Sequence, residues 1–245
     1  MEIIRNCSHY SSIQVAVKLN QKDLPVRVIK SAFNQDGANT IRNEKAGILW
    51  YEKRLNSVLS AVVSLENYKN TYSRLELIYK NGSSGDLTLS LSRNYQKLYN
   101  ALKYHIKIFA AGENRFSHGD YSIDNILFDG DEVTWILDWE SFNDKLPREF
   151  DIVYCIIEAS YFCYKKYGTL KRKDVDAAIE LFKFGFGELK IPYERIIQAP
   201  ASYMRKLFQD NEEVFGSQIK KYPIANCMQN DILSLDNFYA KNIRL

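Results

Sequence analysis

Short runs of alternating apolar and polar residues occupy the first third of the chain, and this period of two is typical of half-buried β-strands. Residues 13–18 and 26–30 flank a polar turn and predict an antiparallel hairpin, with a short strand over residues 2–5 beside it. Two further strands are predicted over residues 61–65 and 75–79. The beginning of the chain is therefore expected to form a small antiparallel sheet.

One helical pattern lies among these strands and is expected to end near residue 55. Its inward stripe consists of apolar residues at intervals of three, four and seven, namely Ile41, Ile48, Tyr51 and Leu55. Asn39 or Thr40 is expected to cap its first turn. Glu44 falls on the same stripe, and it needs a cationic partner because an isolated buried charge is costly.

The later part of the chain has mainly helical periodicity. Helices are predicted over residues 87–110, 152–162, 174–189, 193–209 and 226–240. Residues 80–85, a lysine followed by asparagine, two glycines and two serines, separate the two patterns. The sequence therefore predicts an α+β protein with two lobes, over residues 1–81 and 82–245.

Composition narrows the class of protein. The 245 residues are 46% hydrophobic and 26% charged, as in ordinary globular proteins, and a net charge of +3 does not indicate a nucleic-acid partner. No apolar run approaches the roughly 18 residues of a membrane span, and the N-terminus lacks a signal-peptide core. The four cysteines lack zinc-ligand spacing, so a cytoplasmic protein without disulfides or zinc is expected.

Residues 116–140 carry the densest set of candidate chemical groups. Two apolar runs, 126–128 and 133–137, are joined by a turn that contains Gly130, which predicts a tight β-hairpin because glycine accepts positive φ.

Three polar residues flank this hairpin. Asn125 lies just before its first strand and Asp138 just after its second, so both side chains are expected at the same end. Amide and carboxylate oxygens are ligands that Mg²⁺ prefers. Asp120, five residues before Asn125, would supply a carboxylate for the proton of a hydroxyl group.

The spacing resembles the catalytic stretch of protein kinases, where His-Arg-Asp is followed after four residues by Asn and then by a second Asp. Gly119 replaces the kinase arginine, and Asp138-Trp139-Glu140 replaces the Asp-Phe-Gly triplet. The stretch is more similar to the aminoglycoside phosphotransferase and choline kinase family of small-molecule kinases. The resemblance extends over residues 13–157. It implies a bilobal protein-kinase-like fold, with a nucleotide-binding antiparallel-sheet N-lobe that has one helix and a mainly helical C-lobe for catalysis and acceptor binding.

The resemblance also implies roles for individual residues. Asp120 would be the catalytic base, and Asn125 and Asp138 would hold Mg²⁺. His118 and Asp151 would support the catalytic loop structurally rather than transfer protons.

Other acidic residues leave alternatives open. Glu140 is expected to face the active site and contact substrate or metal, although a solvent-facing glutamate fits equally well. The acidic run Asp210, Glu212 and Glu213 could attract an amino sugar, but such a run is usually a solvated helix end.

Two lysines compete for the phosphates of a nucleotide. Lys18 ends a Val-Ala-Val-Lys sequence that is similar to the kinase strand motif. Lys30 is preferred because it leaves room upstream for a complete hairpin and precedes Glu44 by 14 residues, close to the family interval. A Lys30–Glu44 pair would position the α- and β-phosphates of ATP.

The expected phosphate-covering loop, residues 5–13, contains no glycine, so its amides cannot approach phosphates as closely as a glycine-rich loop permits. The hydroxyl groups of Ser8, Ser11 and Ser12 could substitute. By resemblance to the hinge of kinases, the backbone of Ile78, Tyr79 and Lys80 would bind the adenine edge.

The predicted function is therefore an ATP- and Mg²⁺-dependent transfer of phosphate to a hydroxyl of a small polar metabolite, such as a sugar, an aminoglycoside or an amino alcohol. The sequence indicates neither the acceptor nor the oligomeric state. A catalytically silent kinase-like protein that binds a nucleotide or a partner is the alternative, favoured by the glycine-free loop. A protein kinase is disfavoured by Gly119 and by the lack of an activation segment after Glu140.

Overall fold

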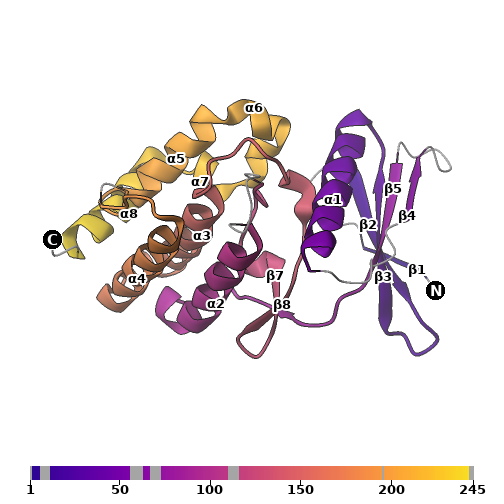
Figure 1. Ribbon diagram of the computed structural model, residues 1–245, viewed down its shortest axis with the longest axis horizontal. Coiled ribbons are helices and arrows are strands. Elements are labelled where there is room, and N and C mark those ends of the chain that lie inside the picture. Colours follow the sequence, from indigo (N-terminus) through magenta and orange to yellow (C-terminus); the bar gives the residue numbers. More distant parts are fainter. Residues whose placement is uncertain are drawn as a thin grey trace. The chain divides into compact units, whose positions relative to one another are not determined.

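The computed structural model describes residues 2–5, 12–55, 63–66, 73–109, 116–194 and 196–242. The chain divides into two compact units (Figure 1). The first contains Met1–Asn81 together with Asp138–Phe142, and the second contains Gly82–Leu137 and Asn143–Leu245. The α+β class is confirmed, with small antiparallel sheets and a mostly helical remainder.

A five-stranded antiparallel sheet forms most of the first unit, in the order β1-β2-β3-β5-β4. The strands are β1 (Glu2–Arg5), β2 (Ile13–Leu19), β3 (Pro25–Ala32), β4 (Val63–Glu66) and β5 (Ser73–Ile78). The predicted hairpin of β2 and β3 is confirmed. Lys30 lies on the central strand, where its register partners are Val15 and Leu75.

Helix α1 (Gln35–Arg54) starts earlier than its pattern predicted. Its cap is Asn34, whose side chain accepts a hydrogen bond of 2.9 Å from the backbone N–H of Gly37. Asn39 and Thr40 lie inside the helix, and the Thr40 hydroxyl donates to the carbonyl of Asp36. The predicted cap was wrong because the first turn carries few apolar residues that would mark it as helical.

The first unit closes around a small core beneath α1. Ala32, Ala38, Ile41 and Leu75 are buried there. Gly37 is required at the start of the helix, since a Cβ atom at this position would lie 2.5 Å from the carbonyl oxygen of Ser12.

The second unit contains a three-stranded sheet in the order β6-β7-β8. The predicted hairpin is confirmed as β7 (Ile126–Asp129) and β8 (Glu132–Ile136), with Gly130 at a φ of 60° in the turn. The two-residue strand β6 (Ser83–Ser84) pairs with β7 inside the segment that its composition predicted to be a breaker.

Helices make up the rest of the second unit (Figure 1). They are α2 (Leu91–Phe109), α3 (Phe150–Tyr167), α4 (Arg172–Leu189), α5 (Pro200–Asp210), α6 (Glu212–Phe215), α7 (Pro223–Asn226) and α8 (Gln229–Asn242), with the 3₁₀ turns η1 (Ile123–Asn125) and η3 (Gly216–Lys221). Helix α5 begins at Pro200 rather than near residue 193. Proline suits a first helical turn because its missing N–H would have no intrahelical partner there.

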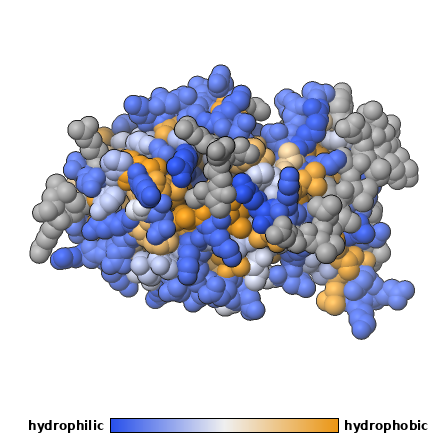
Figure 2. Space-filling model, in the orientation of Figure 1, coloured by the Kyte–Doolittle hydropathy of each residue, from blue (hydrophilic) through white to orange (hydrophobic). Residues whose placement is uncertain are grey.

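The surface of the described residues is mostly polar. Figure 2 shows hydrophilic residues over much of the visible face, with smaller apolar areas between them. Among the helices of the described residues, none combines the length and apolar character needed to cross a membrane.

Candidate active site

Four charged residues meet in the first unit. The ammonium of Lys30, on β3, lies 2.8 Å from Glu44 Oε1 on α1. It lies 2.9 Å from Asp138 Oδ1 and 3.1 Å from Glu140 Oε1, around the 3₁₀ turn η2 (Trp139–Ser141). The structure thus brings together four of the residues selected from the sequence. Lys18, the competing lysine, is exposed on β2.

Burial and charge act against each other in this cluster. Burial alone would lower the pKa of Lys30, but attraction to Asp138, Glu44 and Glu140 outweighs it and raises the pKa well above the ordinary value. Burial raises the pKa of Glu44 to about 7 despite the attraction of Lys30, and the negative charges of Asp138 and Glu140 add to the rise.

The donor set of this cluster fits a hard cation. Oxygen atoms of Glu44, Asp138 and Glu140 lie within 4.8 Å of one another, and three carboxylates exceed the charge of one lysine. A divalent ion would offset that excess of negative charge. Asp138 also adopts the left-handed conformation, with a φ of 58°, which is unusual for a residue with a side chain. Such strained positions cluster at functional sites.

Helix α1 also anchors the turn that carries Asp138 and Glu140. Gly47 allows the close approach, because a Cβ atom at this position would lie 2.8 Å from Trp139 Cβ. The Trp139 ring is buried, with its centroid 4.9 Å from that of Tyr51. Glu44 and the η2 turn are therefore held by the same helix.

In the second unit, Asp151 holds the backbone of the predicted catalytic loop. Its Oδ2 accepts hydrogen bonds from the amide of His118 at 2.8 Å and from His105 Nε2 at 2.9 Å. Its Oδ1 accepts from the amide of Gly119 at 2.9 Å. Gly119 has a φ of 80°, which a glycine adopts at little cost.

The hydrogen bonds of His118 indicate a neutral ring. Its Nε2 donates to the carbonyl of Leu137 at 2.8 Å, and its Nδ1 accepts from the amide of Asp120 at 3.3 Å. The side chain is fully buried, so it braces the loop and is not exposed to a substrate. Structural support of the loop stays the predicted role of His118.

Asn125 is oriented by the same loop. Its Nδ2 donates to the carbonyl of Asp120 at 3.0 Å, which directs the amide oxygen away from that bond. Its own carbonyl accepts from the amide of Leu137 at 2.8 Å, so the hairpin ladder continues to the residue before Asp138. Asn125 lies in the second unit and Asp138 in the first, so a shared metal stays a prediction.

Two residues beside Asp120 were not found by the sequence analysis. Lys221 Nζ lies 3.8 Å from Asp120 Oδ2, and both side chains are largely buried. Glu158 on α3 accepts a hydrogen bond of 2.5 Å from the Tyr154 hydroxyl. Burial, followed by the charges of Asp120 and Asp124, raises the pKa of Glu158 to about 8.

Replacing Asp151 with asparagine is expected to lower the free energy of unfolding at pH 7 by about 2–3 kcal/mol, because the amide cannot accept from all three donors. Burial alone would raise the pKa of Asp151, but the hydrogen bonds that its carboxylate accepts from His105 and from the backbone of His118, together with the electrostatic attraction of these residues, lower it. A group with a depressed pKa stabilises the fold above its unfolded pKa, about 3.9. The difference between the proteins should therefore shrink as the pH falls below about 4.

Urea unfolding of both proteins between pH 3 and pH 7 measures this difference. Asp144→Asn, which changes an exposed carboxylate in the same unit, is the matched control. If the Asp151→Asn and Asp144→Asn proteins had the same free energy of unfolding, Asp151 would not stabilise the loop.

Glu158→Gln tests the neutral buried acid. The folded protein retains a proton that an unfolded glutamate releases above about pH 4.3, so the stability of the parent should fall relative to the variant between about pH 5 and pH 8. The limiting slope is about 1.4 kcal/mol per pH unit. Urea unfolding across this range measures it, with the exposed Glu188→Gln as control. Parallel stability profiles would show that Glu158 is ionised.

The remaining predicted nucleotide contacts are serines of the phosphate-covering loop and the backbone of residues 78–80. Ser8 and Ser11 lie outside the described residues. The backbone carbonyl of Ser12 accepts a hydrogen bond of 3.0 Å from the amide of Phe33. The amide of Tyr79 donates to the carbonyl of Val26 at 3.0 Å, so a base would have to use other backbone groups of residues 78–80.

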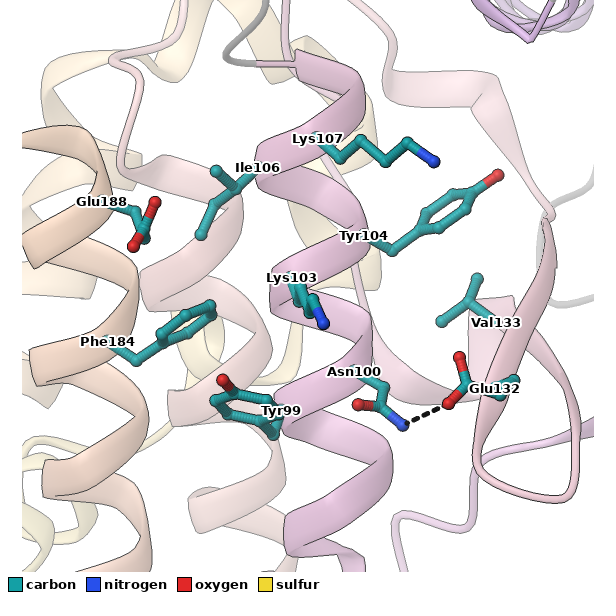
Figure 3. Close-up of a pocket in the computed structure, with 10 residues that line it drawn as sticks. All are labelled: Tyr99, Asn100, Lys103, Tyr104, Ile106, Lys107, Glu132, Val133, Phe184 and Glu188. Atoms are coloured by element: carbon teal, nitrogen blue, oxygen red, sulfur yellow. Dashed lines mark hydrogen bonds between the residues drawn. The ribbon is translucent and has the colours of Figure 1, made fainter.

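A separate pocket of about 650 Å³ lies in the second unit, between α2, α4 and β8. Figure 3 shows the rings of Tyr99 and Phe184 on one side, and Asn100 bonded to Glu132 on the other. None of the residues that line it is among the predicted site residues. It is therefore distinct from the catalytic loop.

A match to a protein-family model agrees with the motif. Residues 73–169 match the model of a phosphotransferase enzyme family, APH. Among solved structures, the GDP complex of wild-type aminoglycoside 2'-phosphotransferase-IIIa is 11% identical and has a TM-score of 0.44, covering 98% of this chain and 93% of that one. The GDP complex of a mutant of the same enzyme is 12% identical and has a TM-score of 0.40, covering 88% and 93%. No curated protein matched the chain.

Proposed function

From the resemblance to the phosphotransferase family, confirmed over residues 73–169, we propose that the protein transfers the γ-phosphate of ATP to a hydroxyl group of a small polar metabolite. The family match supports a phosphotransferase, and the reaction, the cofactors and the residue roles are our proposal. The buried free thiols of Cys155, Cys163 and Cys227 suit the cytoplasmic location expected for such an enzyme.

The observation that carries the proposal is the fixed loop around Asp120. Asp151 holds the amides of His118 and Gly119, His118 accepts from the amide of Asp120, and Asn125 donates to its carbonyl. This network fixes the backbone on both sides of a carboxylate. Fixed geometry is what phosphoryl transfer requires from a protein.

Asp120 would accept the proton of the acceptor hydroxyl. As that oxygen forms a bond to the γ-phosphorus, the bond from the γ-phosphorus to the bridging oxygen breaks and ADP leaves with the electron pair. The neutral ring of His118, which already donates to Leu137, would hold the loop and transfer no proton.

The first unit would bind the nucleotide phosphates. Lys30, oriented by Glu44, would attract the α- and β-phosphates, and Asp138 would hold Mg²⁺ together with Asn125. Bound Mg²⁺ would neutralise charge on the phosphates during transfer. Glu140 lies in the same cluster, and we assign it to the metal or its water rather than to bulk solvent.

A silent kinase-like protein remains the second candidate, because residues 5–13 contain no glycine. Incubation with Mg²⁺, γ-labelled ATP and a panel of sugars, aminoglycosides, amino alcohols and hydroxy acids separates the two. A labelled small product that forms with Mg²⁺ and does not form when EDTA is added supports the phosphotransferase. Binding of ATP without any transfer supports the silent protein.

A further inference from the structure

A buried cation from the last part of the chain, Lys221, lies beside the predicted base Asp120. Lys221 ends η3, beyond the residues that match the family model. Its side chain is 8% exposed and that of Asp120 is 13% exposed, with 3.8 Å between Nζ and Oδ2. A buried ammonium is costly to desolvate, so the fold places this charge at a specific position.

The ring of Tyr222, which belongs to an aromatic cluster, lies beside Lys221. Lys221 Nζ lies 5.5 Å from the centroid of the Tyr222 ring. Tyr222 in turn packs against Tyr154, Phe208 and Phe215, with ring centroids 5.0–5.6 Å apart. Charges interact more strongly in such surroundings than in water. The charge of Lys221 would therefore discriminate between molecules bound beside Asp120 according to the charge that they carry near the reacting hydroxyl.

The separation within the pair also matters. At 3.8 Å the two groups attract through charge at a distance longer than an N–H···O hydrogen bond. The flexible stem of a lysine allows its ammonium to turn toward an oxygen of a bound molecule without leaving the carboxylate.

We propose that Lys221 recognises the acceptor, and that the acceptor carries an anionic oxygen group, a carboxylate or a phosphate, close to the hydroxyl that is phosphorylated. This inference rests on the proposed function, since it takes Asp120 as the group that receives the hydroxyl proton. An amine at the same place in the acceptor would be repelled by Lys221.

The acidic run near the end of α5 does not oppose this assignment. Asp210, Glu212 and Glu213 are exposed at the end of α5 and the start of α6, as expected of solvated helix ends. The cation beside Asp120 is buried, so it acts on an acceptor with less screening than these carboxylates do.

Matched acceptors test the inference. Each hydroxy acid is compared with its neutral amide and with the corresponding amino alcohol, and each sugar phosphate with its free sugar, using Mg²⁺ and ATP. The anionic member should have a kcat/KM about tenfold or more above its neutral partner, and the amine should be poorer still. The hydroxy-acid and sugar-phosphate arms identify which anionic group is recognised.

Variants of two adjacent lysines supply the control. Lys221→Met should raise KM for the anionic acceptor about tenfold or more, leave KM for the neutral one within about threefold, and remove the preference. Lys221→Arg retains the charge and should retain the preference. Lys220→Met changes an exposed neighbour and should match the parent. Binding of Mg²⁺ and ATP by each variant shows that it is folded.

The outcomes separate this inference from the proposed function. Three results would overturn the role of Lys221 while leaving the kinase intact. They are equal use of neutral or cationic acceptors, a preference for the anionic acceptor that survives in Lys221→Met, and ATP turnover in which no anionic acceptor is used. A protein that neither binds ATP nor transfers phosphate would remove both.

Discussion

Replacing Asp120 with asparagine is expected to lower kcat for phosphoryl transfer by about 10²–10⁴-fold, the usual contribution of a positioned general base. Asparagine is nearly isosteric, and the Asp120 amide and carbonyl contacts to His118 and Asn125 involve the backbone, so the loop should persist although the charge that faces Lys221 is lost. The affinity for ATP should change by less than about threefold, because Asp120 acts on the acceptor rather than on the nucleotide. Steady-state kinetics and calorimetric titration with Mg²⁺ and ATP measure the two quantities.

The control for this prediction is Asp129→Asn, which changes an exposed carboxylate at the end of β7 in the same unit. It should retain the parental rate. If Asp120→Asn phosphorylated its acceptor as fast as Asp129→Asn does, Asp120 would not be the base.

Replacing Lys30 with methionine is expected to lower the free energy of unfolding of the first unit by about 3–5 kcal/mol, the cost of removing one partner from a buried ion pair. Glu44 is almost fully buried beside the lysine, and Asp138 and Glu140 would then face it without the intervening cation. Protonation of Glu44 would recover part of the loss, so the effect should be larger at pH 8 than at pH 6.

Two further variants make this prediction specific. Lys18→Met removes the exposed lysine that competed with Lys30 in the sequence and should change stability by less than about 0.5 kcal/mol. Lys30→Met combined with Glu44→Gln should be more stable than Lys30→Met alone, because it removes the buried charge left behind. Denaturant unfolding followed by tryptophan fluorescence measures all three, and Trp139 is an internal probe of this unit. Equal losses for Lys18→Met and Lys30→Met would contradict the cluster.

Local patterns predicted those elements whose signals lie within a few residues. The β7–β8 hairpin follows from two apolar runs and Gly130, and the β2–β3 hairpin from alternation around a polar turn. The start of α1 was missed because a single side chain, Asn34, sets it ahead of the apolar stripe. The start of α5 depends on Pro200 in the same way.

Contacts between distant parts of the chain account for what was missed. Lys30 and Glu44 could be paired because a burial pattern and a family interval both indicated them. Lys221 contacts Asp120 although about a hundred residues separate them in the sequence, and His105 on α2 contacts Asp151 on α3. No spacing rule connects such residues, because tertiary packing alone brings them together.

The central claim is that this chain moves a phosphoryl group with Asp120 as the base and with Asn125 and Asp138 as metal ligands. A single-turnover experiment with γ-labelled ATP, Mg²⁺ and an acceptor tests it most directly. The account predicts label in the acceptor for the parent, and, for Asp120→Asn and Asp138→Asn, labelled ATP recovered unchanged over the same period. Label recovered entirely in ATP from the parent protein, with the nucleotide bound, would contradict it.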